Sequence, residues 1–222
     1  MSESTFVPTP NPDTLGFITK MAAGYCLKPN VDEVVECATA GVRRAIDTLN
    51  MRLWNWALAY QDITFVAATG EYQAEADLKA PRRFTLIDSD SLEAGTLTYY
   101  PWPEFITRLA HDPSTEPCSY SLSNMTQFGT ITLSASPSTD WVVKYPTGRL
   151  WYYRRVPYPV ATSDIVIAPP EIVAYVLEYA SGFTADRYAV NKAPMAYARA
   201  EMLKRDLIRD DNETSPDWEG MR

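Results

Sequence analysis

The sequence predicts an α+β fold in which N- and C-terminal helices form a helical bundle and carry an inserted antiparallel β-sandwich or barrel-like segment. Apolar residues recur with a helical period before residue 60 and again after Pro169-Pro170, whereas the intervening stretch alternates with a period of two. Turn-forming pairs such as Thr69-Gly70 and Thr147-Gly148 divide that stretch into short runs. We therefore expect a helical bundle from residues 12–60 and 165–209, a β-rich insertion at 61–164, and extended or flexible tails at 1–11 and 210–222.

Two helices are predicted before the β-rich segment. The first follows Asn11, a favourable N-cap, with a proline next in the first turn. The second helix has the stronger signal, because Asn30 and Glu33 have the spacing of a capping box at its N-terminus. Its apolar stripe runs from Val31 to Trp56, so one face must be covered by other elements.

Five to eight short strands are expected in the β-rich segment. The alternation begins at Ile63, and later strands are marked by β-branched and aromatic residues. A short helix is expected from Trp102 to Ala110, after Pro101. The residues that mark the later strands are Phe84, Leu86, Leu97, Tyr99, Ile131, Leu133, Val142, Trp151 and Tyr153.

Two more helices are predicted at the C-terminal end. The first begins at the prolines 169 and 170, and its apolar face comprises Ile172, Val173, Val176, Leu177, Ala180 and Phe183. The second starts near Pro194, with a weaker apolar set of Met195, Ala198, Met202, Leu203 and Leu207. Beyond it the chain is too polar to form a core.

The charge and the reactive residues exclude several functions. A net charge of −8 disfavours a broad grip on nucleic acid or an anionic membrane, and no apolar stretch approaches the roughly 20 residues that span a bilayer. His111 is the only histidine, the three cysteines lack metal-ligand spacing, and no glycine-rich phosphate loop is present. We therefore expect no catalytic residue, no metal and no cofactor.

Arginine pairs and aromatic residues are the candidates for partner binding. The pairs fit solvated faces with local ion pairs, ion pairs to another subunit or protein, or phosphate contacts. Trp218 stands in an acidic segment without a core to enter, which favours docking onto a partner. The candidate partner-binding residues are Phe6, Arg43, Arg44, Arg82, Arg83, Arg154, Arg155, Leu207, Ile208 and Trp218.

The order of these landmarks carries a family resemblance. A helix ending in Trp54-Asn55-Trp56 precedes the strand at Ile63 and then Gly70-Glu71-Tyr72, and Trp102-Pro103-Glu104-Phe105 opens a short helix. The strand at Ile131 ends in a proline turn before Trp151-Tyr152-Tyr153-Arg154-Arg155-Val156-Pro157 and a final helix pair. Over roughly residues 30 to 205 the chain resembles the head-to-tail adaptor, or connector, proteins of tailed bacteriophages. It departs from them in lacking a proline at 73–77.

The resemblance implies a structural virion protein without catalytic activity. Such a protein forms a homo-oligomeric ring, usually of twelve copies, below the portal protein in the neck, and it joins the head to the tail or nozzle proteins. The resemblance also implies synthesis in the cytoplasm of the host bacterium and a virion location at the head–tail junction. DNA would pass through the ring without sequence-specific binding, and an acidic wall would suit that passage. The terminal segments containing Phe6 and Trp218 would be clasps to the portal or tail.

Other functions stay open at this point. The chain could be a tail-terminator or tail-nozzle protein instead of the portal-proximal ring. It could also be a monomeric carbohydrate-binding β module, with several exposed tryptophans on one sheet face, or an enzyme of a type that the residues do not reveal.

Overall fold

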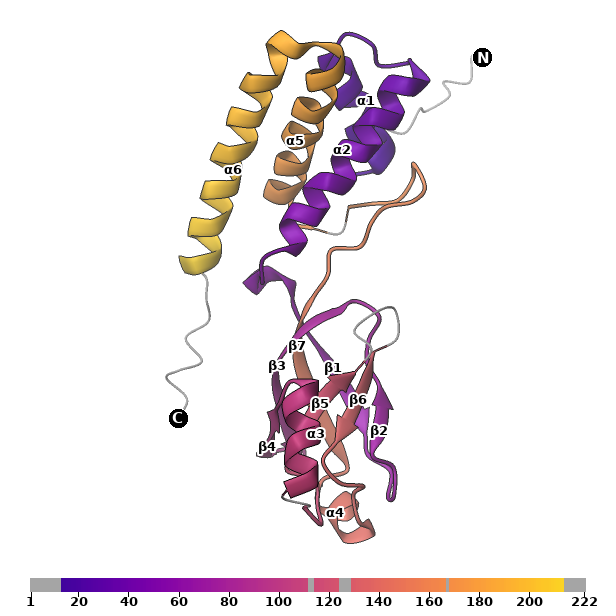
Figure 1. Cartoon of the computed structure of the whole chain (residues 1–222), viewed down its shortest axis with the longest axis vertical. Coiled ribbons are helices and arrows are strands. Elements are labelled where there is room, and N and C mark those ends of the chain that lie inside the picture. The colour runs from indigo at the N-terminus through magenta and orange to yellow at the C-terminus, as the bar shows by residue number, and fades with distance from the viewer. Residues whose placement is uncertain (1–12, 112–113, 124–128, 167, 214–222) are drawn as a thin grey trace, which may run out of the picture. The chain divides into compact units, whose positions relative to one another are not determined.

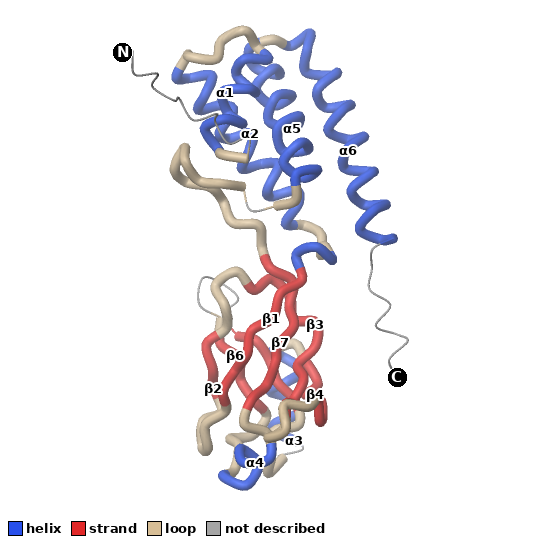
Figure 2. Tube along the Cα trace, turned by 180° about the vertical axis from the view of Figure 1, so that it is seen from behind, coloured by secondary structure: helices blue, strands red, loops and turns tan. Residues whose placement is uncertain are grey.

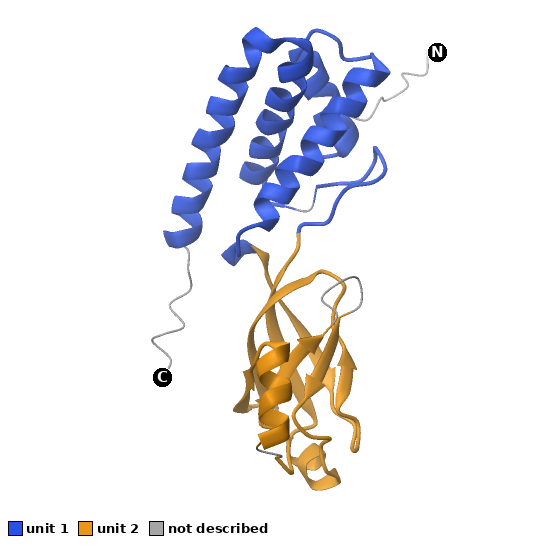
Figure 3. Cartoon of the chain, viewed as in Figure 1, with its two compact units in different colours: residues 1–56, 156–222 blue, residues 57–155 orange. Residues whose placement is uncertain are grey.

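A computed structural model describes residues 13–111, 114–123, 129–166 and 168–213. The chain divides into two compact units, shown in different colours in Figure 3. One unit combines Met1–Trp56 with Val156–Arg222 and is helical, and the other is Ala57–Arg155 and contains the sheet. The predicted α+β class is confirmed, because helices from both ends of the sequence form one bundle and a curled sheet lies between them in sequence.

The helical unit is organised around one central helix. α5 packs against each of the other three long helices, as Figure 1 shows. The bundle core is formed by aliphatic side chains such as Ile46 on α2 and Ile172 on α5, both fully buried. The helices are α1 (Leu15–Tyr25), α2 (Asp32–Asn50), α5 (Pro170–Tyr188) and α6 (Ala193–Glu213), with 3-10 turns η1 (Asn55–Ala57) and η2 (Val190–Lys192).

The starts of the first two helices differ from the predicted caps. Thr14, rather than Asn11, caps α1, and its hydroxyl accepts a hydrogen bond from the Phe17 amide at 3.3 Å. Val31 stands at the N-cap of α2, where no side chain makes a capping bond. The predicted stripe of α2 was also too long, because the helix ends at Asn50 and Leu53 beyond it is exposed.

The predicted apolar face of α6 is wrong. Met195 and Met202 are exposed, and the buried residues of the helix are Ala193, Ala196 and Ala200 with Asp211. The cause is the close packing of α5 and α6, where the ring of Tyr197 lies on Gly182. A Cβ at Gly182 would lie 2.9 Å from Tyr197 Cδ1, so only glycine leaves room for the ring. Small side chains on α6 therefore face α5, and the methionines face outward.

The boundaries of the β-rich segment also differ from the expected 61–164. The sheet unit begins at Ala57 and ends at Arg155. Residues 156–168 belong to the helical unit because the Asn50 side chain bonds both the amide and the carbonyl of Val156, at 2.9 and 3.0 Å. At the other end, α6 continues to Glu213, so residues 210–213, which were expected in the tail, are helical, and the rest of that expected tail lies outside the described residues.

The sheet unit is a seven-stranded curled sheet in the order β1-β7-β3-β4-β5-β6-β2. Figure 2 shows β1, β7 and β3 side by side. The insertion was predicted to be antiparallel, but β4 and β5 pair in parallel because α3 connects them as a crossover. The strands are β1 (Leu58–Thr64), β2 (Glu71–Gln73), β3 (Leu78–Ile87), β4 (Glu93–Tyr99), β5 (Ser119–Ser123), β6 (Thr130–Leu133) and β7 (Thr147–Arg154), and the helices are α3 (Trp102–His111) and α4 (Thr139–Lys144).

An aromatic cluster fills the inside of the curled sheet. Phe84 is fully buried and packs against Phe65 and Tyr120, at centroid distances of 6.0 and 5.1 Å. Leu150 and Tyr152 of β7 face this core, so the alternating residues Trp151 and Tyr153 face the other side. Val142, expected in a strand, lies in α4 and contributes to the core from there together with Trp141.

Alkaline pH is expected to destabilise the helical unit through Tyr175. Burial raises the pKa of this hydroxyl to about 12, against an ordinary value of 10.0. Between pH 10 and 12 the unfolded chain therefore releases a proton that the folded chain retains, and stability falls as pH rises through this window. The fall in the urea midpoint, followed by helical circular dichroism between pH 10 and 12, should be smaller in Tyr175→Phe. An unchanged pH dependence in that variant would contradict the assignment.

Candidate interaction surfaces

The metal-ligating side chains of the described residues lie apart from one another. Over 13–111, 114–123, 129–166 and 168–213, no group of three His, Cys, Asp or Glu side chains could hold a metal ion. His111 is the exposed last residue of α3. Cys118 is also exposed, whereas burial raises the pKa values of the Cys26 and Cys37 thiols. No helix among the described segments has the length and apolarity needed to cross a membrane.

The outer face of β1 and β7 carries paired aromatic and charged side chains. Tyr60 of β1 is 54% exposed and lies 5.2 Å from the Trp151 ring of β7. Arg149 lies over Tyr60 at 4.4 Å and donates two hydrogen bonds to Asp62, at 2.7 and 2.9 Å. Tyrosine, tryptophan and arginine are the residues that dominate binding energy at protein interfaces. This face therefore has the composition of an interaction surface.

Two of the predicted arginine pairs belong to the neighbouring part of this sheet. Arg82 lies over the Tyr153 ring at 5.8 Å, and Arg83 pairs with Glu93 at 3.3 Å. Arg154 pairs with Leu78 across β7 and β3, so the strand register brings the second arginine pair next to the N-terminal end of β3. Burial, together with the charge of Arg155, lowers the pKa of Lys79. The pairing of β3 with β7 therefore brings two arginine pairs that are far apart in the sequence onto neighbouring strands.

The third arginine pair lies on the helical unit. Arg43 and Arg44 are exposed on α2 and line a groove of about 490 Å³ with Glu36, Ala40 and Asp47. The Asp47 carboxylate accepts a hydrogen bond from the Tyr158 hydroxyl. Along this groove two arginines lie between two acids, which favours a partner that also carries both charges.

The C-terminal candidates fall partly within the described residues. Leu207 and Ile208 lie on α6, where each is half-buried, while Phe6 and Trp218 lie outside the described residues. Asp211, buried at 6% exposure, accepts a hydrogen bond from the Asn55 amide at 2.7 Å. The Asn55 side chain donates to the Asp211 carbonyl at 2.9 Å, and Arg52 lies 3.7 Å from the carboxylate. These bonds fix the end of α6 to the segment that follows α2.

Loss of the Asp211 carboxylate should loosen the end of α6. Asp211→Ala leaves the Asn55 amide without this acceptor and removes one partner of Arg52, whose guanidinium also donates to the Asn212 side chain at 2.6 Å. The change should lower the free energy of unfolding of the helical unit by about 2 kcal/mol. Hydrogen exchange of the amides in 203–213 should accelerate accordingly. The exposed neighbour Asp210→Ala serves as the control, and equal protection in both variants would contradict the anchoring role.

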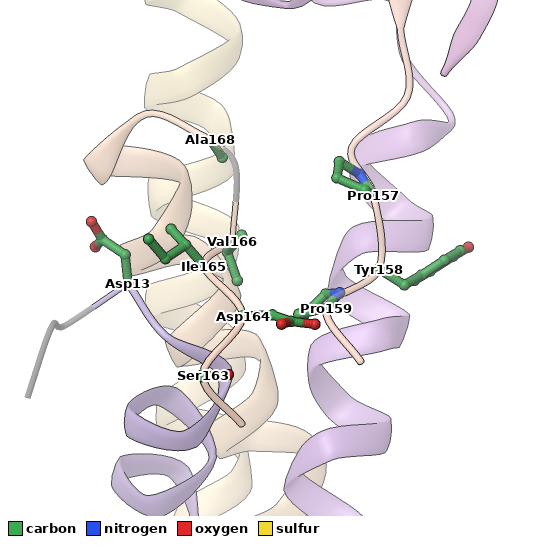
Figure 4. Close-up of a pocket in the computed structure, with 9 residues that line it drawn as sticks. All are labelled: Asp13, Pro157, Tyr158, Pro159, Ser163, Asp164, Ile165, Val166 and Ala168. Atoms are coloured by element: carbon green, nitrogen blue, oxygen red, sulfur yellow. The ribbon is translucent and has the colours of Figure 1, made fainter. Parts of the chain in front are cut away.

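A second groove lies within the loop that precedes α5. The groove has a volume of about 660 Å³. Three largely apolar residues line it on the first arm of the loop, and Ile165 and Val166 line it on the second arm, as Figure 4 shows. The loop is bonded to α1: the Leu15 and Gly16 amides donate to the carbonyls of Asp164 and Thr162, at 2.9 and 2.8 Å. Backbone amides of residues 160 and 161 donate to Asp164 and lower the pKa of its carboxyl. The residues on the first arm are Pro157, Tyr158 and Pro159.

The described tryptophans do not gather on one sheet face. Trp54 and Trp141 are buried, and they belong to different units. Trp151 lies on the outer face of β7, and Trp102, at 39% exposure, begins α3. The described tryptophans therefore do not form the exposed sheet face that a carbohydrate-binding module would need.

Comparison with known families identifies the family of the chain. The model of the SU10 adaptor protein family matches residues 22–218, which include all the helices and strands described above except the start of α1. The chain belongs to this family of phage head–tail adaptors. No curated protein is a detectable relative by sequence. The family match confirms the resemblance seen in the order of sequence landmarks.

Membership makes the adaptor a structural phage protein that assembles with head or tail components. The family is not a class of enzymes. The surfaces of the adaptor are therefore its functional features. Sequence patterns found the arginine pairs but missed Tyr60 and Arg149, although the strict alternation on β1 and β7 places these residues opposite the core-facing set.

Proposed function

We propose that this adaptor forms a ring of twelve copies below the portal protein and connects the head of a tailed phage to its tail or nozzle in the virion neck. The family match over residues 22–218 carries this proposal. A closed ring requires two different complementary patches on each subunit, because every copy contacts one neighbour on each side. The outer face of β1 and β7 and the groove of α2 are candidates for such patches.

We further propose that DNA passes through the ring without sequence-specific binding. Each copy carries a net charge of −8, so twelve copies would present a strongly negative assembly. Such an assembly repels phosphate groups, and DNA would slide past it instead of adhering.

Co-sedimentation with purified partners tests the position in the virion. The full chain is mixed with purified portal protein in one sample and with purified tail or nozzle proteins in another. A ring adaptor below the portal should sediment with the portal even when tail proteins are absent. A chain that ignores the portal and binds only tail proteins would instead be a tail-terminator or nozzle protein, and the proposed position would be wrong.

A further inference from the structure

We propose that the outer sheet surface around Tyr153 binds the acidic segment 213–219 of a second copy of this chain. This surface, here called the Tyr153 patch, consists of Tyr60, Lys79, Arg82, Trp151, Tyr153 and Arg155. The inference rests on the proposed ring and names one of its contacts. It assigns the C-terminal segment to the neighbouring subunit, whereas the sequence alone suggested a clasp to the portal or tail.

The aromatic half of the patch offers a stacking surface. Tyr60 and Trp151 form a cross-strand pair, and Tyr153 follows on the same side of β7, one alternation further. Tyr60 is more than half exposed although its ring is packed on Trp151 and Arg149. Rings that are already held by neighbours lose little conformational freedom when they bind another aromatic side chain.

The charged half of the patch is cationic. On this part of the sheet, the Asp62 carboxylate pairs with Arg149 and the Glu93 carboxylate pairs with Arg83. The charges near Tyr153 are Arg82, which lies over its ring, and Arg155, two residues further along the chain. Burial, and after it the charge of Arg155, lowers the pKa of the Lys79 ammonium. The Asp77 carboxylate accepts a hydrogen bond from the hydroxyl of Tyr152, whose ring faces the core side of the sheet. An acidic ligand would therefore gain Coulomb energy at this surface.

The segment 213–219 has the complementary chemistry. It contains Glu213, Asp217 and Glu219 around Trp218, and it contains no basic residue. The described part of α6 ends at Glu213, and six further residues to Glu219 reach at most about 20 Å. A tryptophan flanked by acids matches a patch of aromatic rings flanked by cations.

A second copy is the occupant that the ring favours. A head-to-tail ring needs an acceptor and a donor surface on the same chain, and the Tyr153 patch and segment 213–219 are one such pair. DNA would also be attracted to cations, but the net charge of −8 opposes its approach to the protein. The exposed Tyr60 and Trp151 rings can stack on a tryptophan side chain. Phosphate groups of DNA would need only the cations of the patch and would not use these rings.

Photo-cross-linking identifies the occupant directly. A photoreactive phenylalanine analogue replaces Trp218 in a ¹⁵N-labelled chain, which is mixed with unlabelled chain carrying Trp218 and with purified portal protein, then irradiated. The expected product joins labelled residue 218 to an unlabelled peptide from β1, β3 or β7. Cross-links only within one labelled chain, only to portal protein, or only to other surfaces of the neighbour would overturn the inference. Rings with any of these patterns would still support the proposed function, whereas absence of rings on the portal would count against that function itself.

A charge exchange tests the electrostatic match. Asp217→Arg with Glu219→Arg, and separately Arg82→Glu with Arg155→Glu, should each raise the concentration needed for ring assembly by about tenfold or more. Combining both changes in one chain should restore assembly to within about threefold of the natural protein. Trp218→Ala should weaken assembly by about 30-fold, as expected for an aromatic hot spot.

Two controls separate binding from folding. Circular dichroism should show that every variant keeps the natural fold, and Lys144→Glu reverses an exposed charge on α4, near the opposite end of β7, without affecting assembly. Equal weakening by Lys144→Glu, failure of the exchanged charges to restore assembly, or displacement of the 218 cross-link by a short DNA duplex would each contradict the inference.

Discussion

Replacing Phe84 with alanine is expected to lower the free energy of unfolding of the sheet unit by about 4 kcal/mol. The ring is fully buried, lies between Phe65 and Tyr120, and fills the centre of the aromatic core. The surrounding strands are held in register by hydrogen bonds on both sides of β3, so the cavity cannot collapse. Hydrogen exchange of amides in 57–155 measures the loss for this unit separately from the helices.

Gly148 provides a sharper form of this test. A Cβ at this position would lie 2.5 Å from Phe84 Cε2 and 2.6 Å from Phe65 Cζ. Gly148→Ala alone should therefore destabilise the sheet unit by about 2 kcal/mol, and its cost should fall when Phe84 is already alanine. Leu92→Ala, at a position 64% exposed, is the matched control and should change stability by less than about 0.5 kcal/mol. Strict additivity of the two core changes would contradict the packing described.

Replacing Gly41 with leucine should lower the free energy of unfolding of the helical unit by about 3 kcal/mol. Gly41 lies where α2 crosses α5, and a Cβ there would be 2.9 Å from the Ala180 Cα and 3.2 Å from the Phe183 Cβ. Because the first of these atoms is backbone, the helices must separate to admit any side chain. The separation would also expose Val42 and Ile172, which are fully buried at present.

A second glycine gives the control for Gly41. Gly24 of α1 has only Pro29 near its missing Cβ, at 3.9 Å. Gly24→Ala should leave stability unchanged or raise it by about 0.5 to 1 kcal/mol, because alanine is the better helix former. Thermal unfolding followed by circular dichroism compares the two variants. Similar midpoints for Gly41→Leu and the natural chain would show that α2 and α5 do not pack as described.

Periodicity was sufficient to predict the fold class and the core faces of several elements. The set Ile172, Val173, Val176 and Ala180 on α5 is buried as expected, because a helix between three others needs a wide apolar face. The short helix at Trp102 is also present. These predictions depend only on local spacing, which the tertiary structure preserves.

Predictions that depended on the identity of the packing partner were wrong. For α6, the larger apolar residues Met195 and Met202 suggested a core face, yet α5 presents Gly182 and selects the alanine face. The end of the sheet unit at Arg155 was equally hidden, because it follows from bonds between Asn50 and Val156, 106 residues apart. The parallel pairing of β4 and β5 requires knowledge of where α3 packs.

The role of the arginine pairs in partner binding stays a prediction, but the structure shows where they lie. The arginine pairs were conspicuous as dipeptides, but only the register of β3 and β7 places Arg82 on Tyr153 and brings Lys79 close to Arg155. Tyr60 and Arg149 belong to β1 and β7, which are far apart in sequence but pair in the sheet. Tyr60 packs on Trp151, and Arg149 forms an ion pair with Asp62, so the four side chains form one surface. The alternation of residues along one strand does not reveal which other strand pairs with it.

Electron microscopy of the full chain mixed with purified portal protein tests the central claim most directly. The account predicts a closed ring of adaptor copies on one face of the portal, with an open axial channel and density joining the C-terminal end of each copy to the sheet unit of its neighbour. Portal particles without added density, together with an adaptor that stays monomeric at every concentration tried, would contradict it.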